Sequence, residues 1–211
     1  MTDLGVIILA GGQSRRMGRN KALLRLAPDE PTLIEQVVAQ VQPLGPVLLV
    51  TNTPEDYTFV RLPMVPDALP GTGALGGLYS GLQAAPAPYN LTVACDMPFL
   101  APALLAYLAA QPHDYDVLIP RWHEPGAAKP QLETLLAIYS RACVPAIAAH
   151  LAAADLRMIS FFPDVRVRYV DEPELRLVDP LLASFRNLNT PAELAQAQQT
   201  DQGATPDPAA P

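Results

Sequence analysis

An apolar run near the N-terminus, residues 4–10, has a β-branched centre and contains no charged side chain. Such a run is typical of a strand that is buried on both faces, as strands are in a parallel sheet. Residues 46–51, 89–95 and 117–119 repeat the pattern, and segments with helical apolar spacing lie between them. The sequence therefore predicts an α/β fold, with three layers around a mostly parallel, doubly wound central sheet.

Local signals place further elements along the chain. Thr32 precedes a run with helical spacing at 33–41, and Glu35 follows it three residues later, which predicts an N-cap with a capping box. The glycine-rich segment 70–78 is expected to form a loop that leads into a helix. We expect helices at 103–110 and 145–154, one strand at 132–139, shorter strands at 160–162 and 165–170, and a final helix opening at Thr190 and Pro191.

Composition limits the class of protein. The chain has 211 residues, half of them hydrophobic, and a net charge of −7, which argues against nucleic acid as a partner. The sequence shows no basic leader and no membrane-length apolar run, and its two cysteines suit a reducing compartment, so a cytoplasmic protein is expected. We expect one domain over residues 1–199 and a disordered tail over 200–211.

The first predicted strand runs into a loop that is rich in glycine and basic residues. Gly11 and Gly12 let backbone amides approach a phosphate group closely, since no Cβ stands in the way. The spacing is neither that of a P-loop nor that of a dinucleotide fingerprint, and an ordinary solvated basic loop is the alternative. A polyphosphate site would use the cations that follow, which are Arg15, Arg16, Arg19 and Lys21.

Asp96 directly follows the predicted strand at 89–95, and Pro98 turns the chain away two residues later. A carboxylate at the carboxyl end of a strand is well placed to hold Mg²⁺, which takes one or two protein carboxylates together with water and substrate phosphates. The alternative is that Asp96 only caps the turn. Cys95 is interpreted as a core residue, because no histidine nearby would activate its thiol.

The segment Leu9-Ala10-Gly11-Gly12-Gln13-Ser14-Arg15-Arg16-Met17-Gly18-Arg19-Asn20-Lys21 resembles the signature of Rossmann-like nucleotidyltransferases. It is most similar to that of the MobA-like molybdenum cofactor guanylyltransferases, and Cys95-Asp96-Met97-Pro98 resembles their metal motif. The resemblance implies transfer of GMP from GTP to molybdopterin, with molybdopterin guanine dinucleotide and pyrophosphate as products. A cytidylyltransferase for the same cofactor, or another small nucleotidyltransferase, is the alternative; Gly11, where the cytidylyl group has Ala, favours GTP.

The resemblance assigns roles to individual residues. Lys21, Asp96, Arg15 and Arg16 are the expected catalytic residues, and Asp96 is the expected Mg²⁺ ligand. Asn52 and Asp67 match family residues that contact the nucleotide, although either could be a simple turn residue. The full nucleotide-binding set implied by the resemblance is Leu9, Ala10, Gly11, Gly12, Lys21, Asn52, Asp67 and Asp96.

The acceptor side is assigned less directly. Asn187 and Asn189 lie in a string similar to the family's Asn-x-Asn-Thr-Pro motif, and their side chains could complete the metal shell or bind the pterin side of the acceptor. The alternative is that this string only begins a helix. Lys129 and Arg157 are candidate contacts of the molybdopterin phosphate, and Trp122 beside His123 could stack on a pterin ring. The expected partners are GTP and molybdopterin, with or without molybdenum, and the resemblance allows for molybdoenzyme chaperones. Neither nucleic acid nor a membrane is expected.

Overall fold

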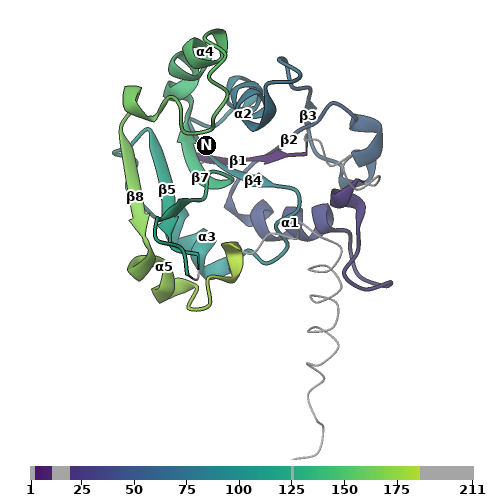
Figure 1. The fold of residues 1–211 in the computed structure, drawn as a ribbon. Helices are drawn as coiled ribbons and strands as arrows, with labels where there is room; N and C mark the ends of the chain where they lie inside the picture. The colour runs from purple at the N-terminus through teal and green to yellow at the C-terminus, as the bar shows by residue number, and fades with distance from the viewer. Residues whose placement is uncertain (1–2, 11–19, 125, 186–211) are drawn as a thin grey trace, which may run out of the picture.

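The structure is a computed structural model that describes residues 3–10, 20–124 and 126–185. Within this part of the chain, eight strands form one sheet in the order β3-β2-β1-β4-β7-β5-β6, and β8 pairs with β5 (Figure 1). The strands are β1 (Leu4–Leu9), β2 (Val47–Val50), β3 (Met64–Val65), β4 (Tyr89–Ala94), β5 (Val117–Trp122), β6 (Gln131–Leu132), β7 (Leu136–Ser140) and β8 (Val167–Asp171).

The sheet is mostly parallel, as the sequence predicts. β1 pairs in parallel with β2 and β4, β2 with β3, and β5 with β8. β7 is antiparallel to both β4 and β5, and β6 is antiparallel to β5. The carboxyl ends of β1, β2 and β4 therefore meet at one edge, which is where α/β sheets of this kind bind ligands.

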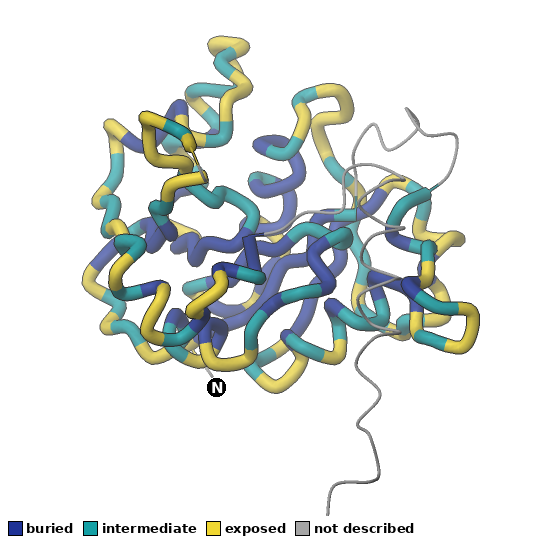
Figure 2. Tube along the Cα trace, turned by 60° about the horizontal axis from the view of Figure 1, so that its bottom comes forward, coloured by how far each residue is buried: buried dark blue, intermediate teal, exposed yellow. Residues whose placement is uncertain are grey.

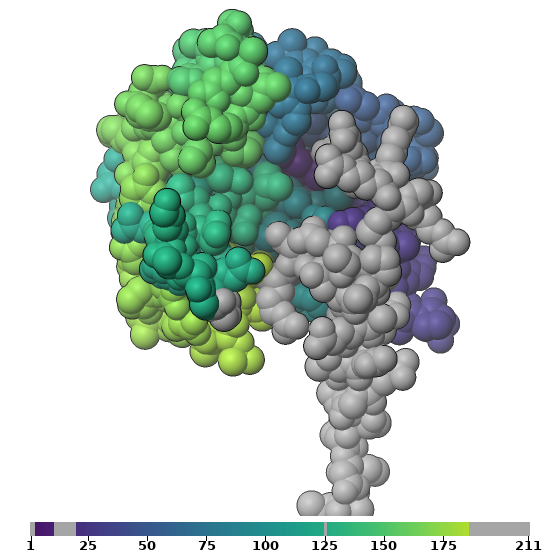
Figure 3. All heavy atoms as spheres, in the orientation of Figure 1, coloured from purple at the N-terminus to yellow at the C-terminus, as the bar shows by residue number. Residues whose placement is uncertain are grey.

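Helices cover both faces of the sheet and make three layers (Figure 1). α1 (Leu33–Val41), α3 (Pro102–Ala109) and α5 (Glu172–Val178) share one apolar core with the sheet, and α2 (Gly73–Ala84) and α4 (Val144–Ala152) share the other. α2 and α4 lie side by side, and Figure 3 shows their side chains in contact at the top of the molecule.

Side chains of β1 alternate between the two cores, which explains why its sequence is apolar throughout. Val6 and Ile8 pack in the core of α1, whereas Ile7 and Leu9 pack against α2. All four are buried, and Figure 2 shows the central strands as the buried part of the chain, surrounded by exposed loops. The apolar run thus fills two cores at once, as expected for a strand between helical layers.

The predicted start of α1 is confirmed. Thr32 is its N-cap, and its hydroxyl accepts a hydrogen bond from the Glu35 backbone N–H. The Glu35 carboxylate in turn accepts hydrogen bonds from the backbone N–H and the hydroxyl of Thr32, both at 2.7 Å. These bonds lower the pKa of Glu35 below its usual value. Both halves of the capping box are therefore formed.

Three predicted elements differ from the structure. The single strand predicted at 132–139 is two strands, β6 and β7, because the chain turns at Glu133 and the Leu136 N–H donates to the Glu133 carbonyl. Residues 160–162 form a turn and the start of a 3-10 helix at Phe162–Asp164 rather than a strand. α2 already begins at Gly73, so Gly76 and Gly77 belong to the helix and not to a loop.

The helix predicted from Thr190 and the tail at 200–211 lie outside the described residues. Within the described part, no helix combines the length and apolarity that crossing a membrane would require. Cys95 and Cys143 are both free thiols.

Candidate active site at the carboxyl edge of the sheet

Backbone pairing brings the predicted nucleotide-binding residues of three strands together. The Ala10 N–H donates to the Val50 carbonyl at 2.9 Å, and the Cys95 N–H donates to the Leu9 carbonyl at 3.3 Å. Leu9 and Ala10 thus lie between the start of the loop at Asn52 and the turn at Asp96. The sheet register therefore gathers residues that are far apart in the sequence at one edge.

A pocket lies on the α2 side of this edge. Its floor is the end of β1 and β2, and its walls are the loop after β3 and the first turns of α2. Glycines at two of the wall positions leave room for a ligand close to the backbone. The lining residues are Leu9, Val50, Thr51, Asn52, Asp67, Gly73, Ala74 and Gly77, so three predicted nucleotide-binding residues line it.

Asn52 and Asp67 are linked within this pocket. Asn52 Oδ1 accepts a hydrogen bond from the Asp67 backbone N–H at 2.9 Å. Asp67 Oδ1 accepts from the Leu69 N–H at 2.9 Å and from the Ser80 hydroxyl at 3.3 Å. Both residues therefore shape the turn, as the simpler interpretation expects, and both also line the pocket. The two roles are compatible, because the hydrogen bonds of the turn hold the side chains in place.

Asp96 follows β4 and is partly buried. Burial raises the pKa of this carboxyl, and the positive charge of Lys21 opposes the rise. Lys21 is the first residue of a short 3-10 helix, η2 (Lys21–Leu23). The structure therefore places the predicted catalytic lysine and the predicted metal ligand close enough to interact electrostatically.

Glu133 is a second carboxylate near Asp96 that sequence reasoning missed. Glu133 lies in the turn between β6 and β7, just before β7 begins, and Asp96 lies just after β4 ends. Because β4 and β7 are antiparallel neighbours, with Val93 opposite Leu136, both carboxylates lie near the same end of this strand pair. The Glu133 N–H donates to the Pro120 carbonyl at 3.0 Å, and one carboxylate oxygen accepts from the Leu135 N–H at 3.3 Å. Burial raises the pKa of Glu133, and the negative charge of Asp96 raises it further.

The two carboxylates suit a divalent cation. Burial disfavours the ionised form of both carboxyl groups, and their negative charges repel each other. A bound cation would therefore stabilise the pair in its ionised form. Among the described residues, no group of three or more His, Cys, Asp or Glu side chains could hold a metal ion. Mg²⁺ takes one or two protein carboxylates and the rest of its ligands from water and substrate phosphates, so the Asp96–Glu133 pair is compatible with this ion.

Cys95 is a core residue, as predicted. Burial raises the pKa of its thiol to about 12, and the charge of Asp96 contributes to the rise. Its side chain packs against the core that contains α1. A protonated thiol is a poor nucleophile, which agrees with the interpretation of Cys95 as a core residue.

The acceptor candidates are more scattered. Lys129 is exposed on the loop before β6. The Arg157 side chain is 74% exposed, and its guanidinium forms two hydrogen bonds with the Asp155 carboxylate, at 2.9 and 2.8 Å. Neither residue lines the pocket. The structure thus gives Arg157 a local partner and leaves its predicted role toward molybdopterin without structural support.

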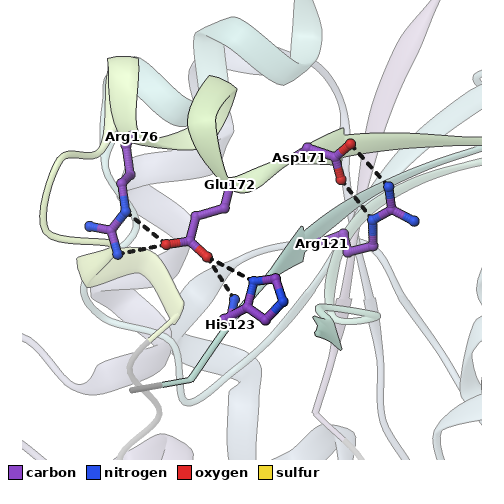
Figure 4. A network of polar contacts seen from close by, with 5 residues as sticks. All are labelled: Arg121, His123, Asp171, Glu172 and Arg176. Carbon is purple, nitrogen blue, oxygen red and sulfur yellow. Dashed lines mark hydrogen bonds and ion pairs between the residues drawn. The ribbon is translucent and has the colours of Figure 1, made fainter. Parts of the chain in front are cut away.

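Trp122 and His123 are likewise held by protein contacts. The Trp122 ring packs on Phe185 with a centroid distance of 5.3 Å. Figure 4 shows Glu172 between His123 and Arg176: it accepts from the His123 backbone N–H at 2.9 Å and from Arg176 at 2.8 Å. These contacts tie the end of β5 to α5.

Beside this cluster, Arg121 pairs with Asp171 through two hydrogen bonds of 2.7 and 3.0 Å (Figure 4). The bonds lower the pKa of Asp171 below its usual value. The pair fastens β5 to β8 where the latter runs into α5. The network in Figure 4 is therefore a structural link between the last elements of the sheet.

Several predicted site residues lie outside the described residues. They are Gly11, Gly12, Arg15 and Arg16 in the first loop and Asn187 and Asn189 near the C-terminus. Their assigned roles remain predictions.

A mostly parallel sheet that carries a pocket, a lysine and a carboxylate at its carboxyl edge is a nucleotide-binding α/β arrangement. The family described as "MobA-like NTP transferase domain" matches residues 6–166. The chain belongs to this family of nucleotidyltransferases. Its fold class and its enzyme class are thus those expected from the sequence.

Individual relatives agree with this assignment. Two of them are each named "Probable molybdenum cofactor guanylyltransferase". The protein from Chloroflexus aggregans is 42% identical over 197 residues, covering 91% of this chain and 92% of the relative. The protein from Pelotomaculum thermopropionicum is 38% identical over 193 residues, covering 91% and 90%. A solved structure, molybdopterin-guanine dinucleotide biosynthesis protein A from Archaeoglobus fulgidus, has a TM-score of 0.78 at 25% identity and covers 94% of this chain and 99% of its own.

Proposed function

We propose that this protein transfers GMP from GTP to molybdopterin, giving molybdopterin guanine dinucleotide and pyrophosphate. The main support is that Lys21 lies close enough to Asp96 to interact with it, and that Asn52 and Asp67 line a pocket at the same edge of the sheet. The names of the relatives support the choice of substrates. We also propose the cytoplasm as its compartment, which the free thiols Cys95 and Cys143 support.

The pocket would hold the guanine base. A carboxylate can accept hydrogen bonds from both the N1–H and the N2 amino group of guanine, whereas cytosine offers a single amino donor next to acceptors. Asp67 is the carboxylate that lines the pocket, and its position is fixed by Leu69 and Ser80. Asp67 is therefore the residue that would favour GTP over CTP.

The triphosphate would extend from the pocket toward Lys21 and Asp96. Lys21, together with Arg15, Arg16 and the amides of Gly11 and Gly12, would neutralise its negative charge. Asp96 would hold Mg²⁺, with Glu133 at its side; when bound, the ion supplies positive charge that offsets charge on the transferring phosphate. Asn187 or Asn189 could add a further oxygen ligand.

The reaction forms one bond and breaks one. An oxygen of the molybdopterin phosphate attacks the α-phosphorus of GTP, and the bond from that phosphorus to the β-phosphate oxygen breaks, so pyrophosphate leaves with the electron pair. A phosphate monoester has its second pKa near 6, so the attacking group is already anionic at neutral pH and needs no general base. The protein must then supply in-line positioning and charge neutralisation. Lys129 and Arg157 remain our candidates for the acceptor phosphate, and product delivery to a molybdoenzyme chaperone remains a prediction.

Isothermal titration with GTP, CTP and ATP, each with Mg²⁺, tests the nucleotide assignment. We expect selective binding of GTP, and pyrophosphate release when molybdopterin is added. Asp67→Asn should lose selectivity, whereas Asp114→Asn, a change of an exposed carboxylate outside the pocket, should not. A preference for CTP would assign the protein to the cytidylyltransferases, and failure to bind any of the three, with or without molybdopterin, would contradict the proposal.

A further inference from the structure

A hydrogen-bonded pair joins the segment after β2 to the turn that carries Lys21. Tyr57 lies in a 3-10 helix, η4 (Pro54–Val60), and only 1% of its surface is exposed. Its hydroxyl lies 2.9 Å from Asn20 Nδ2 and 3.2 Å from Asn20 Oδ1. The phenol can therefore accept a hydrogen bond from one atom of the amide or donate one to the other.

Asn20 in turn shapes η2. It is the N-cap of this helix, and its Oδ1 accepts a hydrogen bond from the Ala22 N–H at 3.2 Å. Its carbonyl accepts from the Leu23 N–H at 3.1 Å, and Ala22 is fully buried. The orientation of one side-chain amide thus sets the first turn of η2, in which Lys21 is the first residue.

We propose that Tyr57 is a positioning residue, whose hydroxyl fixes the Asn20 amide so that the η2 turn presents Lys21 to Asp96. Lys21 is close enough to Asp96 to act on it electrostatically, so a small rotation of the turn would change this interaction. Burial raises the pKa of Tyr57 to about 12, which keeps the phenol protonated and able to donate at neutral pH. Tyr57 is not among the residues that line the pocket, and its hydrogen bonds with Asn20 give it an indirect route to Lys21.

The first test needs no nucleotide. Lys21 and Lys129 are the only lysines in the sequence, so reductive ¹³C-methylation gives two resolvable lysine signals, and Lys21→Ala identifies one of them. Tyr57→Phe removes the hydroxyl and keeps the buried ring. We expect it to shift the Lys21 signal and to leave that of Lys129 unchanged. An unmoved Lys21 signal in folded Tyr57→Phe protein would overturn the inference.

Tyr89→Phe is the matched control. The Tyr89 hydroxyl donates to the His113 carbonyl at 3.2 Å, and Tyr89 is the first residue of β4, at the opposite end from Asp96. Loss of this hydrogen bond should leave both lysine signals in place. If Tyr89→Phe shifted the Lys21 signal as much as Tyr57→Phe does, loss of a distant tyrosine hydrogen bond would be enough to move that signal, and the inference would fail.

The second test rests on the proposed function and measures GTP affinity by calorimetry in a double-mutant cycle. Tyr57→Phe should weaken GTP binding roughly fivefold, which is about 1 kcal/mol, the net value of one hydrogen bond. In the Lys21→Ala background the same substitution should change nothing, because the group that it positions is gone. Equal losses in both backgrounds would show that Tyr57 acts on the fold in general. If wild-type protein does not bind GTP, the proposed function fails, and the lysine signals still decide the role of Tyr57.

Discussion

Two glycines of α2, Gly77 and Gly81, lie one turn apart and face the sheet, yet alanine should have opposite effects on stability at these positions. A Cβ at Gly81 would lie 2.7 Å from Ile7 Cγ2 and 3.1 Å from both Ile7 Cδ1 and Val50 Cγ2. A Cβ at Gly77 would meet only Leu9, at 3.5 and 3.7 Å, which is ordinary van der Waals contact. The sheet beneath the helix thus decides the outcome.

At Gly81 the neighbours cannot move aside. Ile7 is fully buried, Val50 is 2% exposed, and both are β-branched, so their γ-carbons are fixed by one stiff torsion. The new methyl would force α2 away from the sheet, at a cost of about 1–3 kcal/mol. The greater helix propensity of alanine offsets roughly 0.5–1 kcal/mol of this steric cost. The midpoints of these two ranges leave a net destabilisation of about 1.2 kcal/mol, which lowers Tm by roughly 2–5 °C in a domain of this size.

At Gly77 no steric clash opposes the greater helix propensity of alanine, so Gly77→Ala should be about 0.5–1 kcal/mol more stable than wild type. The added methyl, however, projects over Leu9, and both residues line the pocket. We expect GTP affinity to fall about tenfold, which is about 1.4 kcal/mol. Gly77→Ala should thus separate stability from binding.

Thermal unfolding and calorimetric titration with GTP and Mg²⁺ check both variants side by side. We expect Tm to fall in the order Gly77→Ala, wild type, Gly81→Ala, and GTP binding to be weaker in Gly77→Ala. A Gly81→Ala protein as stable as wild type would show that α2 does not pack closely on Ile7. Unchanged GTP affinity in Gly77→Ala would show that this pocket does not hold the nucleotide.

Three further variants test the site and the fold. Asp67→Asn should reduce GTP affinity and leave that for ATP unchanged in calorimetry, because an amide cannot accept from both guanine donors; retained GTP selectivity would argue against this role. Glu133→Gln should weaken Mn²⁺ binding to the GTP-loaded protein, measured by electron paramagnetic resonance. It should not lower Tm, because the substitution removes a charge that burial disfavours. Unchanged Mn²⁺ affinity would exclude Glu133 from the metal site. Hydrogen bonds from Arg166 lower the pKa of Asp116 in the folded protein below its unfolded value of about 3.9. The ion pair therefore stabilises the fold fully above about pH 3.9, and this stabilisation is lost as the pH falls through the pKa of Asp116 in the folded protein. Urea unfolding should therefore show that Asp116→Asn is less stable than wild type at pH 7, and that the difference in the free energy of unfolding becomes smaller at lower pH. A difference that does not change with pH would show that the charge of Asp116 does not stabilise the fold.

Elements with strong local signals could be predicted from the sequence. β1 has an unbroken apolar run, and the capping box of α1 is formed by two residues three positions apart. A similar box, Asp171 with Glu174, opens α5, which the sequence analysis did not include although the same signal was present. The division of 132–139 into β6 and β7 depends on the pairing of Glu133 with the β5 backbone, which no local pattern reveals.

The same distinction holds for the site. Asp96 was found because it follows a buried strand and precedes a proline, and both features are local. Glu133 was missed because its approach to Asp96 depends on the pairing of β4 with β7, which brings the end of one strand to the start of the other. Lys21 was found from its motif, whereas its dependence on Tyr57 rests on a contact across 37 positions of sequence. Contacts between side chains that sheet pairing or packing brings together thus could not be predicted from the sequence.

Pyrophosphate release by Asp96→Asn, with GTP, Mg²⁺ and molybdopterin, tests whether nucleotidyl transfer depends on the carboxylate at the end of β4. Asparagine keeps the size of the side chain and removes the charge that burial penalises, so Tm should be equal to or higher than that of wild type. We expect the rate to fall by about a hundredfold to a thousandfold in this well-folded variant. A rate close to that of wild type would show that Asp96 is not needed for the transfer.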